Sequence, residues 1–350
     1  MSLTGLVAAC GGASPPSAAP NTPSLGASAP GSAAPKPGAS GAAASPASAA
    51  AAAPKPSGAS LALTVAYVAP VAPMAPLWMA DATKAFSQHG VNVTVRFIQA
   101  NAAVPALIAK EVDALEISAA PVITADLNGQ ADLVYVASVL NHSTFVLVVK
   151  NDIKTAADLK GKTIAGDRPG TPTDYGMQAA LGLLKLQPSD VTVRALGSSN
   201  VILQAMLSGQ VDGGLLGQPE SFQAETRGFH VLQDTFGIPY QNTGMVAQRA
   251  RLDQLAPAMP GFLAALRDGI QTFNQQPDVA IKVLQDYTKE TDADILKKTY
   301  DLHHDRAPFE PSLQPTLDGI KAMAAALADT VPAAKTAKPE QFVDTRFLTK

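Results

Sequence analysis

The most distinctive chemistry in the sequence lies in the loop at residues 166–173, which holds two glycines, two prolines and two threonines. A short apolar run at residues 163–165 precedes this loop, and a helical pattern follows from Asp174. Thr171 or Thr173 can cap that helix. A strand–loop–helix start directs unpaired backbone N–H groups at a ligand, and each dipole contact contributes about 0.3–1 kcal/mol. The same residues also suit an ordinary turn between a strand and a helix, so both interpretations remain open.

Two further side chains have a chemistry suited to a small ligand. Arg168 can bind a carboxylate or sulfonate through two parallel hydrogen bonds, or form a surface ion pair with Asp167 or Asp174. Trp78 is the only tryptophan and follows a proline-rich loop, so its ring can stack on a flat ligand or pack in the core. These residues favour an aromatic or alkyl anion as ligand, while a neutral pyrimidine remains open.

Other clusters of polar residues do not indicate catalysis or metal binding. His303 and His304 are adjacent on a predicted helix end and point in different directions, so we expect no metal site there. Glu290, Asp292 and Asp294 are interpreted as a helix-entry cap and a solvated face. The sequence contains no Walker loop, Rossmann fingerprint or Gly-x-Ser-x-Gly motif. We therefore expect no cofactor, no catalytic residues and no enzymatic activity.

Charge and cysteine content exclude further classes of protein. The net charge is −3 and there is no basic run, which argues against nucleic acid or an anionic membrane surface as a partner. The single cysteine, Cys10, excludes an intramolecular disulfide and a cysteine-based metal cluster. No apolar run reaches the length of a membrane-spanning helix.

The first sixty residues differ in composition from the rest of the chain. Residues 6–10, Leu-Val-Ala-Ala-Cys, resemble a bacterial lipobox, in which Cys10 becomes lipidated, although a chance Ala-Ala-Cys remains an alternative. Residues 1–5 lack a basic segment, so we expect residues 1–10 to be a truncated lipoprotein signal. Residues 11–60 are almost entirely Ala, Ser, Pro and Gly, which predicts a disordered linker that tethers the domain to a membrane.

From Leu61 onward, predicted strands alternate with predicted helices, which is typical of parallel βαβ units in an α/β fold. A helix is expected from Leu77 to His89, and another at 102–109 with Pro105 in its first turn. After a strand at 243–247 the pattern becomes helical only. These last helices are expected at about 250–256, 260–275, 277–287, 291–304 and 311–328.

An internal repeat supports two related lobes. The segment from Ala106 to Ser118 matches the segment from Ala205 to Gly217 in pattern, and each passes through Val-Asp into an apolar strand. A proline then opens the next helix, Pro121 in one copy and Pro219 in the other. Because βα units share a hydrophobic template, chance similarity is the alternative to duplication. In related α/β lobes, ligands bind at the carboxyl ends of the strands.

Several segments in this order carry a resemblance to a known family. The AP-containing loop after the first strand, His89-Gly90-Val91, DLKGKTIAG, the PGTPTD helix start and VDGGLLGQPE resemble bacterial ABC-transporter solute-binding proteins. The resembled family binds sulfonates, taurine, nitrate or thiamine-pyrimidine precursors. The resemblance covers residues 61 to about 329, and DLKGK specifies the fold more than the ligand. It implies a two-lobed type-2 periplasmic binding fold, with mostly parallel sheets flanked by helices and a helical C-terminal segment.

The resemblance also implies where the lobes and the ligand lie. Lobe 1 would comprise residues 61–145 and 246–350, and lobe 2 residues 146–245. The ligand would lie between the lobes, against residues that follow the carboxyl ends of strands. From lobe 1 these would be Met74, Pro76, Trp78, Ser118, Ala119, Asn141 and His142; from lobe 2, Asp167, Arg168, Gly170, Thr171, Thr173, Gln218 and Glu220.

The function that this resemblance implies is capture of a small organic solute and its delivery to an ABC importer. The protein would be a monomer, extracytoplasmic and lipid-anchored, with hinge closure around the solute. A sensor domain for a signalling partner is an alternative. A related fungal pyrimidine-forming synthase uses a cysteine-rich iron motif, and the lack of any cysteine beyond Cys10 argues against that chemistry.

Overall fold

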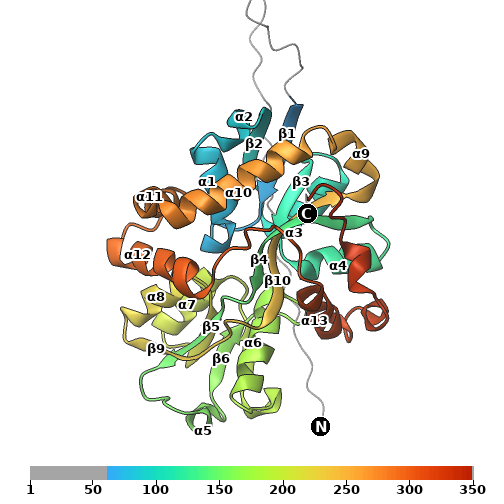
Figure 1. The fold of residues 1–350 in the computed structure, drawn as a ribbon. Helices are drawn as coiled ribbons and strands as arrows, with labels where there is room; N and C mark the ends of the chain where they lie inside the picture. Colours follow the sequence, from blue (N-terminus) through green and yellow to red (C-terminus); the bar gives the residue numbers. More distant parts are fainter. Residues whose placement is uncertain (1–60, 349–350) are drawn as a thin grey trace, which may run out of the picture. The chain divides into compact units, whose positions relative to one another are not determined.

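The computed structural model describes residues 61–348, whose strands form two five-stranded sheets (Figure 1). The first sheet has the order β2-β1-β3-β10-β4, with β1 Leu61–Tyr67, β2 Val91–Phe97, β3 Ala114–Ile117, β4 Leu133–His142 and β10 Pro239–Gln248. The second has the order β7-β6-β8-β5-β9, with β5 Val146–Lys150, β6 Thr163–Gly166, β7 Thr192–Ala195, β8 Gly213–Leu216 and β9 Phe229–Asp234. In each sheet one strand, β10 or β5, runs antiparallel to both of its neighbours. The predicted two-lobed α/β fold is confirmed.

Helices cover both faces of each sheet. In lobe 1 these are α1 Ala75–Ala82, α2 Ala85–Gln88, α3 Ala100–Ile108, α4 Ala119–Leu127, α9 Leu252–Leu255, α10 Met259–Gln275, α11 Pro277–Thr288, α12 Ala293–Asp301 and α13 Leu317–Leu327. In lobe 2 they are α5 Ala156–Leu159, α6 Pro172–Leu183, α7 Ser199–Leu207 and α8 Glu220–Glu225. Helices α1 and α10 pack on one face of the first sheet, and α3, α4 and α13 on the other. Each lobe therefore has three layers.

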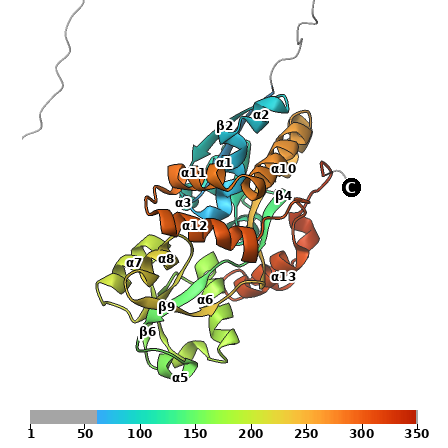
Figure 2. The ribbon, with the colours of Figure 1, turned by 60° about the vertical axis from the view of Figure 1, so that its left-hand side comes forward.

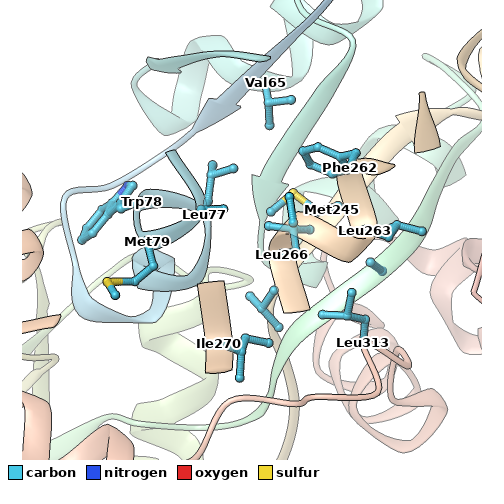
Figure 3. Close-up of a cluster of buried hydrophobic side chains, with 14 of the residues drawn as sticks. Val65, Leu77, Trp78, Met79, Met245, Phe262, Leu263, Leu266, Ile270 and Leu313 are labelled. Carbon is cyan, nitrogen blue, oxygen red and sulfur yellow. The ribbon is translucent and has the colours of Figure 1, made fainter. Parts of the chain in front are cut away.

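The larger core lies between the first sheet and helices α1 and α10 (Figure 3). In the first half of β4, Leu133 and Tyr135 enter one core and Val134 and Val136 enter the other, as the strand period of two requires. Helix α10 approaches α1 closely at Gly269, where a Cβ atom would lie 2.4 Å from the Pro76 carbonyl oxygen. Glycine is therefore needed at this crossing of the two helices.

The two copies of the sequence repeat, Ala106 to Ser118 and Ala205 to Gly217, lead into β3 and β8, which occupy equivalent positions in the two sheets. Asp113 precedes β3, and its carboxylate accepts a hydrogen bond from the Thr64 N–H of β1 at 2.8 Å. Asp212 precedes β8 and accepts in the same way from the Thr163 N–H of β6 at 3.0 Å. Each aspartate also pairs with a cation 2.7 Å away, Arg251 in lobe 1 and Lys150 in lobe 2. Shared strand order and shared contacts support duplication of one lobe.

Three helices differ from their predicted extents. The helix expected from Leu77 to His89 is interrupted at Lys84, which has φ of 64°. Helix α3 starts at Ala100, so Pro105 lies inside it, where it has no N–H to donate to the previous turn. The helix expected from residue 311 begins only at Leu317, because the Thr316 hydroxyl caps it by accepting from the Gly319 N–H at 3.2 Å.

Two short segments connect the lobes, at residues 143–145 and 235–238, and they are hydrogen-bonded to each other. The Ser143 and Thr235 hydroxyls lie 2.5 Å apart, and the Thr235 hydroxyl donates to the Phe145 carbonyl at 2.8 Å. After the second crossover, β10 begins at Pro239, before the predicted lobe boundary at 246. The described residues belong to one compact unit.

The predicted signal and lipobox at 1–10, including Cys10, and the linker at 11–60 lie outside the described residues. Among the helices of residues 61–348, none combines the length and apolar character needed to cross a membrane.

Candidate functional site

The loop at residues 167–173 is held by hydrogen bonds to the start of α6. The Thr171 hydroxyl accepts from the Asp174 N–H at 3.2 Å and donates to the Arg168 carbonyl at 2.9 Å. The Asp174 carboxylate accepts from the Gly170 N–H at 2.9 Å. Thr171, one of the two predicted candidates, is therefore the N-cap, and α6 begins at Pro172. Thr173 is partly exposed in the first turn of the helix.

This loop lies against lobe 1 at the C-terminal end of α13. A Cβ atom on Gly170 would lie 3.1 Å from Leu327 Cδ2 and 3.3 Å from Thr330 Oγ1, and Gly170 has φ of 81°. Asp167 is partly buried, and the Arg168 side chain is exposed. Among residues 61–348, Arg168 forms no ion pair with Asp167 or Asp174, so its guanidinium is not held by either neighbour. Helix α6 thus presents the loop at the boundary between the lobes.

The second group of predicted lobe-2 residues lies where β8 ends and α8 begins. Gln218 is 1% exposed, and its side-chain amide donates to the Thr144 carbonyl of the first crossover at 3.0 Å. Its Oε1 has no hydrogen-bond partner within the described residues, and the same holds for Glu220 Oε2 and for the hydroxyl of Ser221. Burial raises the pKa of Glu220, and the charge of Glu290 raises it further. Three buried acceptor atoms therefore lie on four consecutive residues.

Glu290, in the turn between α11 and α12, brings a second carboxylate to this group from lobe 1. Its Oε2 accepts from the Gln223 side chain of α8 at 2.5 Å, and its Oε1 accepts from the N–H groups of Thr291 and Asp292. Helices α8 and α12 lie side by side in both ribbon views (Figure 2). The interpretation of Glu290 as part of a solvated face is wrong, because the residue is buried across the lobe boundary. Asp292 caps α12, as expected.

The predicted lobe-1 residues around α1 are buried. Met74 is 4% exposed, at the end of the 3₁₀ helix Ala72–Met74, and Pro76 is buried in the first turn of α1. Trp78 is 0% exposed and stacks on Tyr287, with ring centroids 4.7 Å apart. Its ring also meets Tyr67 edge-on at 5.4 Å (Figure 3 shows its place beside the core). In this conformation the ring packs in the core, while its buried Nε1 has no hydrogen-bond partner within the described residues.

The other predicted lobe-1 residues follow β3 and β4. Ser118 is partly exposed at the N-cap of α4, and Ala119 is buried in its first turn. The Asn141 amide donates to the Gln314 carbonyl at 2.8 Å, and its oxygen accepts from the Ser138 hydroxyl at 2.7 Å. His142 Nε2 lies 3.3 Å from the Pro308 carbonyl. Asn141 and His142 thus fasten the segment at residues 307–316 to β4.

Sequence reasoning missed a buried carboxyl group in the first sheet. Glu116 lies on β3 opposite Tyr67 of β1 and Met245 of β10, and it is 0% exposed. Neither carboxyl oxygen has a partner within the described residues, and burial raises its pKa well above the ordinary value. In β3, Ala-Leu-Glu-Ile, polar and apolar residues do not alternate, and all four residues are buried. A glutamate within this apolar run was the signal in the sequence that its carboxyl group is buried.

Two hollows on the described surface lie away from these groups. One hollow of about 420 Å³ is lined by Asp126, Gly129, Ala131, Asp132, Arg249 and Gln341. Another, between α2 and α10, includes Gln88 and Asp268 in its lining. None of the predicted site residues lines either hollow, and both are surface grooves of lobe 1. The candidate site is therefore defined by buried polar groups at the lobe boundary.

Metal binding finds no support in the described part of the chain. His303 is buried with its Nδ1 3.3 Å from the Ala307 carbonyl, whereas His304 is exposed and lies 2.6 Å from Asp305. Among residues 61–348, no three potential metal ligands come together.

The two α/β lobes joined by two crossovers match the two-lobed periplasmic binding protein fold, and comparison with known families identifies the family of the chain. The family model described as NMT1/THI5 like matches residues 72–280, more than half of the 350 residues. The chain belongs to the NMT1/THI5-like family. Among curated protein sequences, none matches this chain.

Several solved structures share the fold. The periplasmic aliphatic sulphonate-binding protein of Escherichia coli has a TM-score of 0.69 at 22% identity, covering 81% of this chain and 97% of that chain. The alkanesulfonate-binding protein of Xanthomonas axonopodis pv. citri, bound to MOPS, has a TM-score of 0.61 at 20% identity, covering 82% and 96%. The periplasmic nitrate-binding protein of Synechocystis has a TM-score of 0.62 at 13% identity, covering 80% and 86%.

Proposed function

We propose that this chain is the solute-binding component of an ABC importer, and that it captures a small organic solute between its lobes. The observation that carries this proposal is the pair of equivalent lobes joined by two short crossovers, with predicted ligand residues after the carboxyl ends of parallel strands. In α/β proteins, ligands bind at such strand ends. Membership of the NMT1/THI5-like family and the fold shared with sulfonate- and nitrate-binding proteins support it.

The solute we favour is a sulfonate, a carboxylate or a related anion. Helix α6 is 12 residues long, and its N-terminal turn, with Thr171 and Thr173, suits an anionic group. The exposed Arg168 guanidinium adds a cation beside this turn. A neutral pyrimidine or thiamine precursor is the alternative, and a sensor domain for a signalling partner remains a further one.

The proposal places the chain outside the cytoplasm, as a monomer anchored through a lipid on Cys10 that delivers its solute to a membrane permease. The lipobox-like residues 6–10 and the periplasmic binding proteins of the same fold support this location. Labelling cells with a radioactive fatty acid tests the anchor: the wild-type chain should incorporate label, and Cys10→Ser should not. Label on both chains, or on neither, would contradict lipidation of Cys10.

A thermal-shift screen of the full chain tests solute binding. The panel holds alkyl and aryl sulfonates, taurine, nitrate, aromatic carboxylates, pyrimidines and flavins. A solute at about a hundred times its dissociation constant should add about 2.7 kcal/mol to the free energy of unfolding, which raises the melting temperature by several degrees. A folded protein that responds to no member of the panel would contradict the proposed function.

A further inference from the structure

The start of α8 carries hydrogen-bond acceptors that the rest of the described chain does not satisfy. Gln218 Oε1, Glu220 Oε2 and the Ser221 hydroxyl are each buried without a partner. Gln218 and Ser221 are both 1% exposed, so bulk water does not reach their side chains freely. Leaving such groups unpaired is unfavourable, and more so for a charged group. A hydrogen-bond donor from outside the described chain would satisfy all three atoms.

The carboxyl groups of Glu220 and Glu290 at this position favour a positively charged hydrogen-bond donor. Glu290 of lobe 1 is the charged group that raises the pKa of Glu220, and it is 9% exposed. Its carboxylate already accepts from Gln223 and from two backbone N–H groups, whereas Glu220 Oε2 accepts from nothing described. Among residues 61–348, no Lys, Arg or His forms an ion pair with either carboxylate. Two carboxyl groups thus lie at the boundary between the lobes, and no cation of the described chain pairs with either.

The two lobes share their strand order but differ at this place. In lobe 1 the end of β3 leads through Ser118 into Ala119 and Ala120, two buried methyl side chains. In lobe 2 the end of β8 leads into Gln218, Pro219 and Glu220. The Gln218 amide is bonded to the crossover at Thr144, so its unpaired oxygen lies beside the hinge between the lobes. The acceptors are therefore a property of one lobe only, at the boundary where the solute is proposed to bind.

We infer that the solute carries a protonated amine, which Glu220 binds as the counter-ion, with Gln218 Oε1 and the Ser221 hydroxyl accepting its remaining N–H bonds. An ammonium group is a compact cation with three donors and no acceptor, which matches three acceptor side chains. This inference rests on the proposed function and narrows its ligand class: the acidic group lies at the start of α6, and the amine at the start of α8. A plain anion would leave these acceptors unpaired next to two carboxylates.

Matched pairs of solutes test this directly by thermal shift and calorimetry on the full chain. The pairs are taurine with isethionate, β-alanine with 3-hydroxypropionate, and 1,3-diaminopropane with 1,3-propanediol; nitrate, alkyl sulfonates and pyrimidines complete the panel. Each pair replaces an amine by a hydroxyl at nearly constant shape. The amine member of the responding pair should bind about 10- to 100-fold more tightly, as expected for a hydrogen bond to a charged group.

Glu220→Gln supplies the second readout, with Glu225→Gln on the same helix as its matched control. Glu220→Gln should remove most of the preference for the amine, while the melting temperature without solute stays equal or rises, because a buried charge is removed. Glu225→Gln, which lies near Lys298 rather than near Glu290, should keep the wild-type preference.

The outcomes separate this inference from the proposed function. Three results would contradict an amine-bearing solute but leave the proposed solute binding intact. They are tight binding of an anion or pyrimidine without an amine, equal affinity for the two members of a pair, and an unchanged preference for the amine in Glu220→Gln. A folded protein that binds no member of the panel would overturn both.

Discussion

At the scale of single residues, the buried carboxyl of Glu116 lowers stability at neutral pH. Its pKa is raised by burial, so the folded protein keeps the proton to higher pH than the unfolded chain does. The contribution to stability is present below about pH 4.5 and is lost as pH rises through the folded-state pKa, by about 1.4 kcal/mol for each pH unit in that window.

Glu116→Met should therefore raise the free energy of unfolding at pH 7 by about 1–3 kcal/mol, because it replaces a buried polar group without partners by an apolar one of similar length. Urea unfolding between pH 4 and pH 8 measures this effect, with the exposed Glu111→Met as the control. A loss of stability at pH 7 would show that the Glu116 carboxyl has a partner that the described contacts lack.

His303 has the opposite effect on the pH dependence of stability, because it destabilises the folded protein as pH falls. Burial lowers its pKa to about 3, and the neutral ring stacks on Phe309 with centroids 5.2 Å apart. The unfolded chain binds a proton below about pH 6.5, so stability is full above that pH and falls as pH decreases towards 3. Between pH 7 and pH 5 the loss should be about 2 kcal/mol.

His303→Asn should flatten this part of the pH profile, because asparagine can donate to the Ala307 carbonyl but does not titrate. Thermal unfolding at pH 5, 6 and 7 measures it. The same slope in the variant and in the wild-type protein would assign the acid sensitivity to other groups.

At the scale of elements, the start of α6 has a structural role and a proposed binding role. Thr171 caps the helix and closes the loop, so Thr171→Ala should cost about 1 kcal/mol of stability. Thr173 forms no cap, and Thr173→Ala should be nearly neutral for folding. The double variant should bind the solute more weakly and remain folded, as calorimetry and circular dichroism can show. Unchanged affinity would remove this turn from the site.

Elements were predictable from the sequence where the signal was local. The Thr171 cap and the Val-Asp repeat follow from short patterns, and both are found in the structure. The packing of Trp78 on Tyr287 and the contact of Gln223 with Glu290 join residues far apart in the chain, which periodicity does not connect. Residues 311–316 were predicted to be helical but are not, and the cause is local. Their apolar pattern suits a helix, but the Thr316 cap starts α13 at Leu317.

At the scale of the whole domain, several contacts hold the lobes together around the proposed site. The Tyr175 hydroxyl of α6 donates to the Pro239 carbonyl at 2.9 Å, and its ring stacks on Tyr240 at 5.2 Å. Arg306 of lobe 1 pairs with Asp234 at 3.0 Å and lies 4.8 Å from the Phe236 ring centre. Under the proposed function, these contacts change when the lobes open to admit a solute.

Arg306→Ala should therefore make opening easier and weaken solute binding by a few fold, since an exposed ion pair contributes about 0–1 kcal/mol. Small-angle scattering without solute should show a larger radius of gyration for the variant than for the wild-type protein. Arg346→Ala, at an ion pair within lobe 1, is the control and should change neither quantity. An unaltered radius and affinity in Arg306→Ala would show that this pair does not hold the lobes.

The most direct test of binding between the lobes is hydrogen–deuterium exchange with the solute that gives the largest thermal shift. Binding should slow exchange in both lobes together, at residues 116–121, 170–175 and 217–222, and at the crossovers. Protection confined to one lobe, or to the surface groove around residues 126–132, would contradict solute capture between the lobes.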